Sequence, residues 1–137
     1  MAQLIPFSDL TGGAENVRFT IINGDTYMSI RDIIMVVCKK KPNDASDAWQ
    51  DIPNEKKKEV TEFLRDFQFP GQGQRVQPVI TLKGALKLIM WLPGDMAKDY
   101  RSQACSILIR FLGGDLSLVE EIEANAASSA PLNVLAR

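Results

Sequence analysis

Residues Val76 to Leu112 constrain the fold more than any other part of the chain. A short apolar run leads into one helical pattern, a Pro93–Gly94 turn interrupts it, and a second, longer helical pattern follows. Two helices are expected because proline disfavours helix in the residue before it. The apolar residues of both recur three or four positions apart, which indicates one buried side on each helix. We therefore expect this helix–turn–helix unit to form the core against which the rest of the chain packs.

A β-hairpin is predicted upstream of this unit. Val17–Asn23 is rich in β-branched residues, Thr26–Ser29 continues in the same manner, and an Asn-Gly pair begins the short link between them. Such a pair suits a tight hairpin turn, because the backbone there needs positive φ angles. A third, short strand is expected at Val79–Thr81, after the loop FPGQGQR at Phe69–Arg75.

Polar residues indicate where several helices begin. Ser29 and Ser117 are each followed three residues later by an acid, which resembles a capping box. Thr81 and Asp95 are candidate N-caps of the two helices in the central unit, because their side-chain oxygens can accept from first-turn N–H groups. Further helices are expected at residues 30–41, 43–51, 54–67 and 118–127.

The composition allows one packed domain and narrows the choice of function. With 137 residues, of which 45% are hydrophobic and 24% charged, the chain is long enough to bury a core. The net charge of −1 argues against a strongly basic nucleic-acid binder but leaves room for local basic patches. No apolar run reaches the length of a membrane span, and the N-terminus lacks the pattern of a secretory signal.

The sequence contains no histidine, which removes the commonest general base and the commonest transition-metal ligand. Its acids stand beside turns or helix starts, where capping accounts for them. We therefore expect no enzyme, no cofactor and no metal. The two cysteines, Cys38 and Cys105, have apolar helical surroundings and are expected to be buried thiols in a reducing compartment, the cytoplasm or the nucleus.

Basic residues occur in several separate clusters that could donate hydrogen bonds to phosphates. Because 17 acidic residues balance 16 basic ones, such clusters would attract DNA strongly only if they converge on one side of the molecule. The alternative for each cluster is solvated surface. The residues predicted to contact nucleic acid are Lys39, Lys40, Lys41, Arg75, Lys83, Lys87, Lys98 and Arg101.

The pattern from Asp95 to Leu112 has a second side that carries little charge. At about 100° per residue, Ser102, Cys105 and Ile109 lie opposite the expected core stripe. One interpretation is a central helix packed on both sides, and the other is a contact surface for a partner, to which Cys105 and Ile109 would contribute. The expected core stripe consists of Ala97, Tyr100, Ala104, Ile107, Leu108 and Phe111.

Two other places are candidate contacts. The loop FPGQGQR offers Gln72 and Gln74 to a partner, and the alternative is a plain connection. It is not a phosphate loop, because it lacks the Lys-Ser/Thr ending and precedes a strand. Arg31 and Asp32, at the junction between the hairpin and the first helix, form either an internal tether or a contact.

Two segments combine these elements in a distinctive order: NGDTYMSIRDII, at Asn23–Ile34, and VITLKGALKLIMWLPGDMAKDYRSQA, at Val79–Ala104. The first has a turn, an aromatic strand and an Asp-apolar-apolar helix start. The second has a short strand, a helix and then a helix with an aromatic–Arg pair, Tyr100–Arg101. This order resembles the N-terminal domain of the BRO (baculovirus repeated open reading frame) family, which is similar to KilA-N domains. The resemblance implies a DNA-binding domain of large DNA viruses, phages or related mobile elements, located in a host cell or a virion.

These patterns together predict an α+β fold in one domain, with an N-terminal β-hairpin and a short strand packed on about five α-helices. The expected organisation is an N-terminal arm at 1–16, a globular domain at 17–127 and a linker or tail at 128–137. The first functional hypothesis is a non-enzymatic DNA-binding module of viral or mobile-element type. The alternative is a protein-interaction or homo-oligomerisation module, such as a homodimer, that uses the 95–112 helix and the acidic C-terminal helix.

Overall fold

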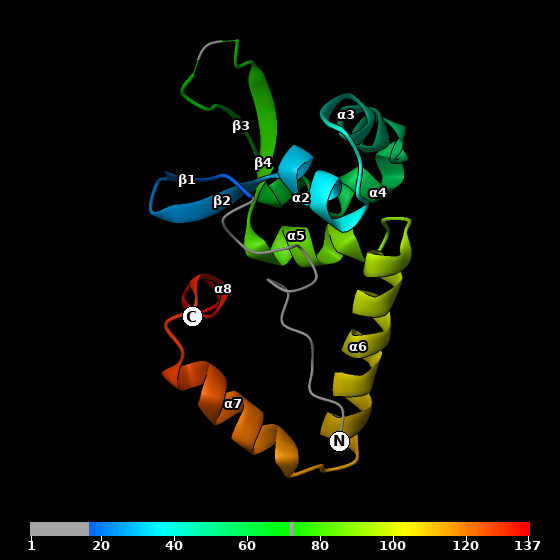
Figure 1. Cartoon of the computed structure of the whole chain (residues 1–137), viewed down its shortest axis with the longest axis vertical. Coiled ribbons are helices and arrows are strands. Elements are labelled where there is room, and N and C mark those ends of the chain that lie inside the picture. The colour runs from blue at the N-terminus through cyan, green and yellow to red at the C-terminus, as the bar shows by residue number, and fades with distance from the viewer. Residues whose placement is uncertain (1–16, 72) are drawn as a thin grey trace.

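The structure, a computed structural model, describes residues 17–71 and 73–137 (Figure 1). The expected N-terminal arm at 1–16 and the candidate contact Gln72 lie outside the described residues. The fold is α+β in a single domain, as the sequence predicts. In chain order its elements are β1 (Phe19–Ile22), β2 (Asp25–Ser29), α2 (Ile30–Val37), α3 (Pro42–Asp51), α4 (Asn54–Lys58), the 3-10 turn η2 (Thr61–Phe63), β3 (Leu64–Gln68), β4 (Val76–Ile80), α5 (Leu82–Ile89), α6 (Asp95–Leu112), α7 (Ser117–Ala127) and α8 (Pro131–Leu135).

The four strands form an antiparallel sheet in the order β1-β2-β4-β3. The hairpin predicted at Asn23-Gly24 is confirmed, and these two turn residues have φ angles of 51° and 84°. β4 pairs with β2 on one side and along its whole length with β3 on the other. The β3–β4 hairpin extends beyond the helices at one end of the molecule (Figure 1).

The main core lies between one face of the sheet and the helices α2 and α5. Met28 and Ile80 point into it from the strands, whereas their neighbours Tyr27 and Val79 form a second, small cluster with Phe69. Successive side chains on a strand point to opposite faces, so the two clusters lie on the two sides of the sheet. Helices α2 and α5 contribute Ile30, Ile33, Ile34, Val37, Ala85, Leu88 and Ile89 to the main core.

The starts of α2 and α5 follow the predicted caps. Ser29 Oγ accepts from the backbone N–H of Asp32 at 3.1 Å, and Thr81 Oγ1 accepts from that of Gly84 at 3.3 Å. Gly84 is buried where α5 approaches β4 and η2. A Cβ at this position would lie 2.6 Å from Ile80 Cγ1 and 2.7 Å from Phe63 Cβ. The close packing of α5 therefore requires a residue without a side chain here.

The prediction of one helix over residues 54–67 is wrong. Helix α4 ends at Lys58, η2 follows, and the chain then continues as strand β3. The spacing of Val60, Phe63, Leu64 and Phe67 fits a helix, but pairing with β4 gives this backbone its hydrogen-bond partners and outweighs the helical pattern. The strand predicted at Val79–Thr81 is β4. It is longer than expected, since it begins at Val76 and ends at Ile80.

The core stripe predicted for α6 is confirmed only in its first part. Ala97 is buried in the main core and Tyr100 packs against it, whereas Ile107, Leu108 and Phe111 are exposed. The same helix exposes Cys105, which was expected to be a buried thiol. The second half of α6 extends away from the sheet and the other helices (Figure 1), so it has no core to pack against.

The last part of the chain also differs from the expectation. Gly94 and not Asp95 is the N-cap residue of α6, and Ser117 is the first residue of α7 and not its cap. Asp115 takes the capping role, because its Oδ1 accepts from the backbone N–H of Ser117 at 3.0 Å. The stretch 128–137, expected to be an irregular linker, contains α8, and Leu135 packs against the main core.

Candidate nucleic-acid interface

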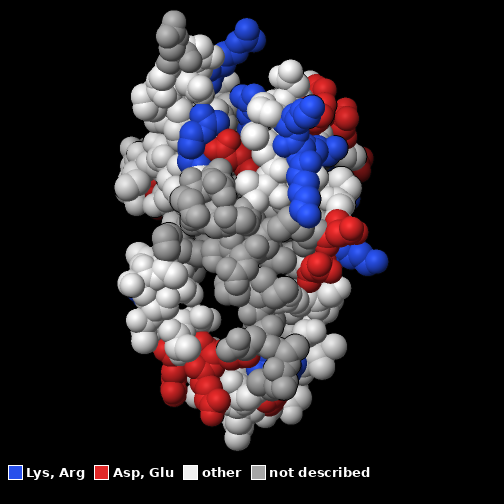
Figure 2. Space-filling view, in the orientation of Figure 1, with Lys and Arg blue, Asp and Glu red and all other residues white. Residues whose placement is uncertain are grey.

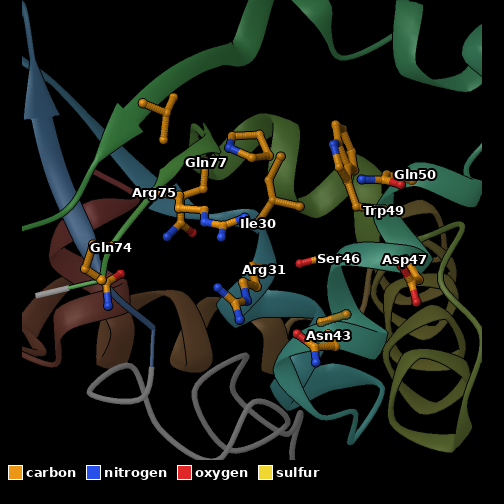
Figure 3. A pocket seen from close by; sticks show the side chains of 14 residues that line it. Ile30, Arg31, Asn43, Ser46, Asp47, Trp49, Gln50, Gln74, Arg75 and Gln77 are labelled. Atoms are coloured by element: carbon orange, nitrogen blue, oxygen red, sulfur yellow. The ribbon is translucent and has the colours of Figure 1, made fainter.

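A polar groove lies between the start of β4 and helix α3, next to the first turn of α2. Its volume is about 740 Å³. Arg31 and Arg75 both line it, and Asp47 is the one carboxylate among its described lining residues (Figure 3). The other polar side chains that line the groove are Asn43, Ser46, Gln50, Gln74 and Gln77.

Arg31 brings an unsatisfied donor to this groove. Within the described part of the chain, its Nε atom is buried and has no hydrogen-bond partner. A buried donor that is left unpaired costs about 1–3 kcal/mol. The other N–H groups of the Arg31 guanidinium can donate to carboxylate or phosphate oxygens bound in the groove, which the side chain lines.

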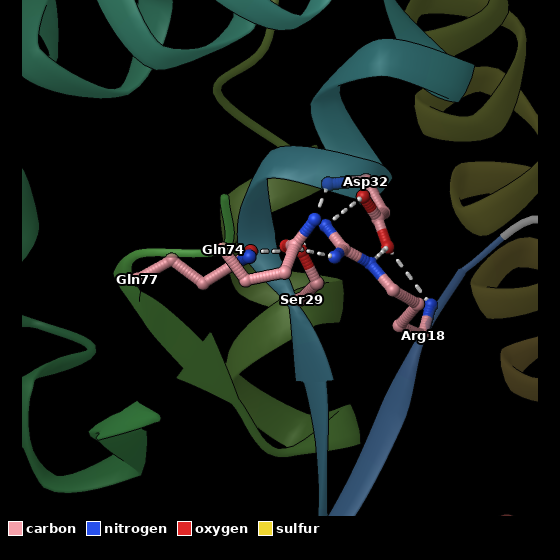
Figure 4. Close-up of polar contacts among 5 residues, drawn as sticks. All are labelled: Arg18, Ser29, Asp32, Gln74 and Gln77. Carbon is pink, nitrogen blue, oxygen red and sulfur yellow. Dashed lines mark hydrogen bonds and ion pairs between the residues drawn. The ribbon is translucent and has the colours of Figure 1, made fainter. Parts of the chain in front are cut away.

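A hydrogen-bond network fixes the sheet side of the groove (Figure 4). Asp32 accepts from three donors of Arg18, the backbone N at 2.9 Å, Nε at 2.8 Å and Nη2 at 3.0 Å. Arg18 Nη1 donates to Gln74 Oε1 at 2.9 Å, and Ser29 Oγ donates to Gln77 Oε1 at 2.6 Å. Two of the lining side chains are therefore held in place before any ligand arrives, which lowers the entropy lost on binding.

Arg18 is a tether and not a free cation. Its hydrogen bonds to Asp32 raise the pKa of the guanidinium above its ordinary value, against the opposing effect of partial burial. The guanidinium also lies over the ring of Phe69, with Cζ 4.8 Å from the ring centroid. Arg18 thus stays charged and links β1 and α2 to the 69–75 loop.

Several lysines outside the groove contact aromatic rings. The Nζ atoms of Lys83 and Lys87 each lie 5.5 Å from the centroid of Phe63, and that of Lys57 lies 4.7 Å from the centroid of Trp49. Among the described residues, salt bridges involve arginines and no lysine. An ammonium group over an aromatic face keeps donors for solvent or an anion, so these lysines remain available to phosphates.

The eight residues predicted to contact nucleic acid do not form one cluster. Arg75 lines the groove, while Lys83 and Lys87 share the ring of Phe63. Arg101 is occupied within the fold, because its Nη1 donates to the carbonyl oxygen of Leu92 at 2.8 Å. Within the described chain, Arg75 is the only member of the predicted set that lines the groove.

The predicted run Lys39–Lys41 lies in the turn between α2 and α3. Lys40 lines a second hollow, of about 430 Å³, whose wall also includes Asp44, Asp47 and Asp51. These carboxylates weaken the attraction of that hollow for phosphate. The last predicted cation, Lys98, is exposed near the start of α6.

The groove also contains residues that the sequence prediction missed. Asn43, Ser46 and Gln50 come from α3, where their spacing of three and four residues places them on one face. A polar stripe on a short helix was the available signal. Of the two residues at the junction between hairpin and helix, Asp32 forms the tether and Arg31 lies in the groove.

The predicted partner contacts fall into two places. Gln74 lines the groove, whereas Cys105 and Ile109 are exposed on α6. The loop and the α6 residues therefore do not share one described surface.

Charge is distributed unevenly along the chain. Residues 17–93 contain twelve Lys and Arg against nine Asp and Glu, a net charge of +3, whereas residues 94–137 contain four against six, a net charge of −2. On the face drawn in Figure 2, most basic side chains lie over the half formed by the sheet and α2–α4, and a group of acidic ones lies at the other end, over α7. Acidic side chains also occur among the basic ones, so the positive surface is interrupted.

No family model, curated protein or solved structure matches the chain. The resemblance to the BRO family therefore stays a prediction. None of the described helices combines the length and apolar character needed to cross a bilayer. Within the same residues, no three His, Cys, Asp or Glu side chains come together as they would around a metal ion.

Proposed function

We propose that the chain is a non-enzymatic DNA-binding module, in which the groove between β4 and α3 receives the phosphate backbone. The observation that carries this proposal is the pair of arginines, Arg31 and Arg75, that line the groove with a single carboxylate, Asp47, among its described residues. Phosphate oxygens are favoured acceptors for the planar fork of a guanidinium group.

The neighbouring β3–β4 hairpin supports the same proposal. A two-stranded ribbon fits the major groove of DNA, and glutamine side chains can bind base edges there. Gln68 lies at the end of β3, and its Nε2 donates to the carbonyl oxygen of Gln74, which keeps the two ends of the loop together. The hairpin extends beyond the helices (Figure 1), so it can approach a duplex while Arg75, at the loop end of the hairpin just before β4, binds phosphate.

The charge balance implies modest, salt-sensitive binding. Each phosphate contact contributes about −0.9 to the slope of log affinity against log salt. Two groove arginines and a few lysines would give a slope of about −3 to −5. The acids among the basic residues keep the affinity below that of a uniformly positive surface.

Fluorescence anisotropy with a labelled DNA duplex at low salt tests the proposal. Arg31→Gln and Arg75→Gln should each weaken binding about tenfold or more, because a hydrogen bond to a charged group contributes about 1.5–3 kcal/mol. Each substitution should also reduce the magnitude of the salt slope by about one.

Lys58→Gln is the matched control, since it removes one positive charge from an exposed position on α4, outside the groove. It should change the affinity much less than the groove variants. A wild-type protein that does not bind the duplex at low salt would end the proposal. A loss for Lys58→Gln equal to that for Arg75→Gln would show that the groove is not the site.

A further inference from the structure

The second half of α6 and the whole of α7 contribute nothing to the core. Beyond Ala104, the described residues of α6 include none that is buried, and α7 has no buried residue. Isolated helices of this length are marginal in water, and most helices in proteins are stabilised by packing an apolar face. Figure 1 shows both helices at the end of the molecule remote from the β3–β4 hairpin.

These two helices and the turn between them expose a large apolar surface, which we call the α6–α7 face. On α6 it continues around the helix, from the stripe of Ile107, Leu108 and Phe111 to the opposite side at Ile109. Its members are between 38% and 80% exposed. Together they offer on the order of 1,000 Å² of apolar surface, well above the roughly 300–600 Å² of the largest patch on a typical monomer. The members of the face are Ile107, Leu108, Ile109, Phe111, Leu112, Leu116, Val119 and Ile122.

Arg110 interrupts this apolar run in the sequence, but it does not place a free charge on the face. Its Nε donates to Asp115 at 3.0 Å, its Nη1 to Glu121 at 2.9 Å and its Nη2 to Ser117 Oγ at 2.9 Å. The side chain is 14% exposed. Arg110 therefore fixes the angle between α6 and α7, and two carboxylates neutralise its charge. The α6–α7 face is thus already formed in the single chain, and Arg110 adds no free charge to it.

We propose that the α6–α7 face is the interface of a symmetric dimer, and that its occupant is the α6–α7 face of a second copy of this chain. The summed exposed apolar area exceeds the roughly 800 Å² that each partner buries in a standard interface, so a second copy that covers most of it is enough. Homodimer and obligate interfaces are also more apolar than the rest of a protein surface. Arg110 brings no unpaired positive charge to such an interface, because it is already paired within its own chain.

A second copy also explains why α7 can be helical without a buried residue. A partner that covers α7 has to be available wherever the chain is made, and a second copy of the same chain meets this requirement. Symmetric pairs are the commonest soluble oligomers. This inference does not depend on DNA binding, because the groove residues and the α6–α7 face share no side chain.

Analytical ultracentrifugation of the full chain without DNA tests the dimer. The expected mass is twice that of the chain, which is 15.2 kDa. Ile109→Glu and, separately, Leu112→Glu should raise the dissociation constant by about a hundredfold or more, because each buries a charge without a partner. Ser106→Glu is the matched control: it adds the same charge at an exposed position of α6 outside the face and should leave the mass unchanged.

A crosslinking experiment on folded Cys38→Ser protein gives a second readout that needs no disruptive change. Cys105 is exposed, and Ile109 and Leu112 follow it at helical spacing, so a short bis-maleimide should join two copies through Cys105. A wild-type mass of one chain at high concentration, or no crosslinked dimer, would overturn the proposal. So would a mass that rises beyond two copies, or dissociation by Ser106→Glu equal to that by Ile109→Glu.

Discussion

Replacing Asp32 by asparagine should destabilise the domain, because one carboxylate joins three parts of the fold. Asp32 lies in the first turn of α2 and accepts from Arg18 at the start of β1 through three hydrogen bonds of 2.8–3.0 Å. Arg18 extends the connection to Gln74 in the 69–75 loop. The substitution keeps the size of the side chain but removes its charge and one of its two acceptor oxygens.

The magnitude follows from this geometry. Removing one partner of a fully buried ion pair costs about 3–5 kcal/mol. The Arg18 side chain is 38% exposed, so water can solvate it when Asp32 no longer does, and the loss should be smaller. We expect about 2 kcal/mol, which corresponds to a fall in Tm of about 8 °C for a domain of this size.

Urea unfolding and thermal unfolding should be measured at one protein concentration, because the stability of a dimer depends on concentration. Arg18→Gln completes a double-mutant cycle, in which the two losses should be strongly non-additive. Asp25→Asn, at an exposed carboxylate of the hairpin turn without a salt bridge among the described residues, is the control and should change little. An Asp32→Asn variant as stable as the wild type, or additive losses in the cycle, would refute the reasoning.

Two further predictions concern packing and pH. Helix propensity alone predicts that Gly84→Ala stabilises α5 by about 1 kcal/mol. The clashes of the new Cβ with Ile80 and Phe63 should turn this into a net loss of about 1–3 kcal/mol in the free energy of unfolding, measured in urea. A variant more stable than the wild type would contradict this prediction. The pKa of Asp115 is lowered by the Ser117 hydroxyl, the Ser117 backbone N–H and Arg110. The ionised carboxylate therefore stabilises the fold at pH values above its ordinary pKa of 3.8, and this stabilisation is lost as the pH falls through the lowered pKa. The helix content measured by far-UV circular dichroism should therefore fall below about pH 3.8, and it should fall less in Asp115→Asn. Identical acid titrations of the two proteins would contradict this role of Asp115.

Local signals predicted the parts of the fold that depend on neighbouring residues. The Asn23-Gly24 turn needs positive φ angles, and Ser29 and Thr81 cap helices through their own side chains. Each of these features is fixed by chemistry within a few residues, so the sequence alone was sufficient. The same holds for the α+β class, which follows from the order of these elements.

Features that depend on distant partners could not be predicted in this way. Leu64–Gln68 is a strand because β4 lies beside it, although its apolar spacing also fits a helix. Arg31 lines the groove because α3 and the start of β4 come together beside it. These two segments are far apart in the sequence, so no local pattern could predict that they meet. Periodicity found the apolar stripe of α6 but could not say how far the core covers it. The core covers Ala97 and contacts Tyr100, and Phe111 near the end of the helix stays exposed.

The two proposed surfaces lie in different parts of the molecule, and this separation determines how they would act together. The groove lies among α2, α3 and β4, whereas the α6–α7 face is at the far end of α6 (Figure 1). A symmetric pair joined through α6 and α7 would hold two grooves at a fixed distance, so one duplex long enough to reach both would bind more tightly than either groove alone allows. Ile109→Glu should then weaken binding to a long duplex while leaving binding to a short one unchanged, whereas Arg75→Gln should weaken both. Equal effects of Ile109→Glu on long and short duplexes would mean that the two surfaces act independently.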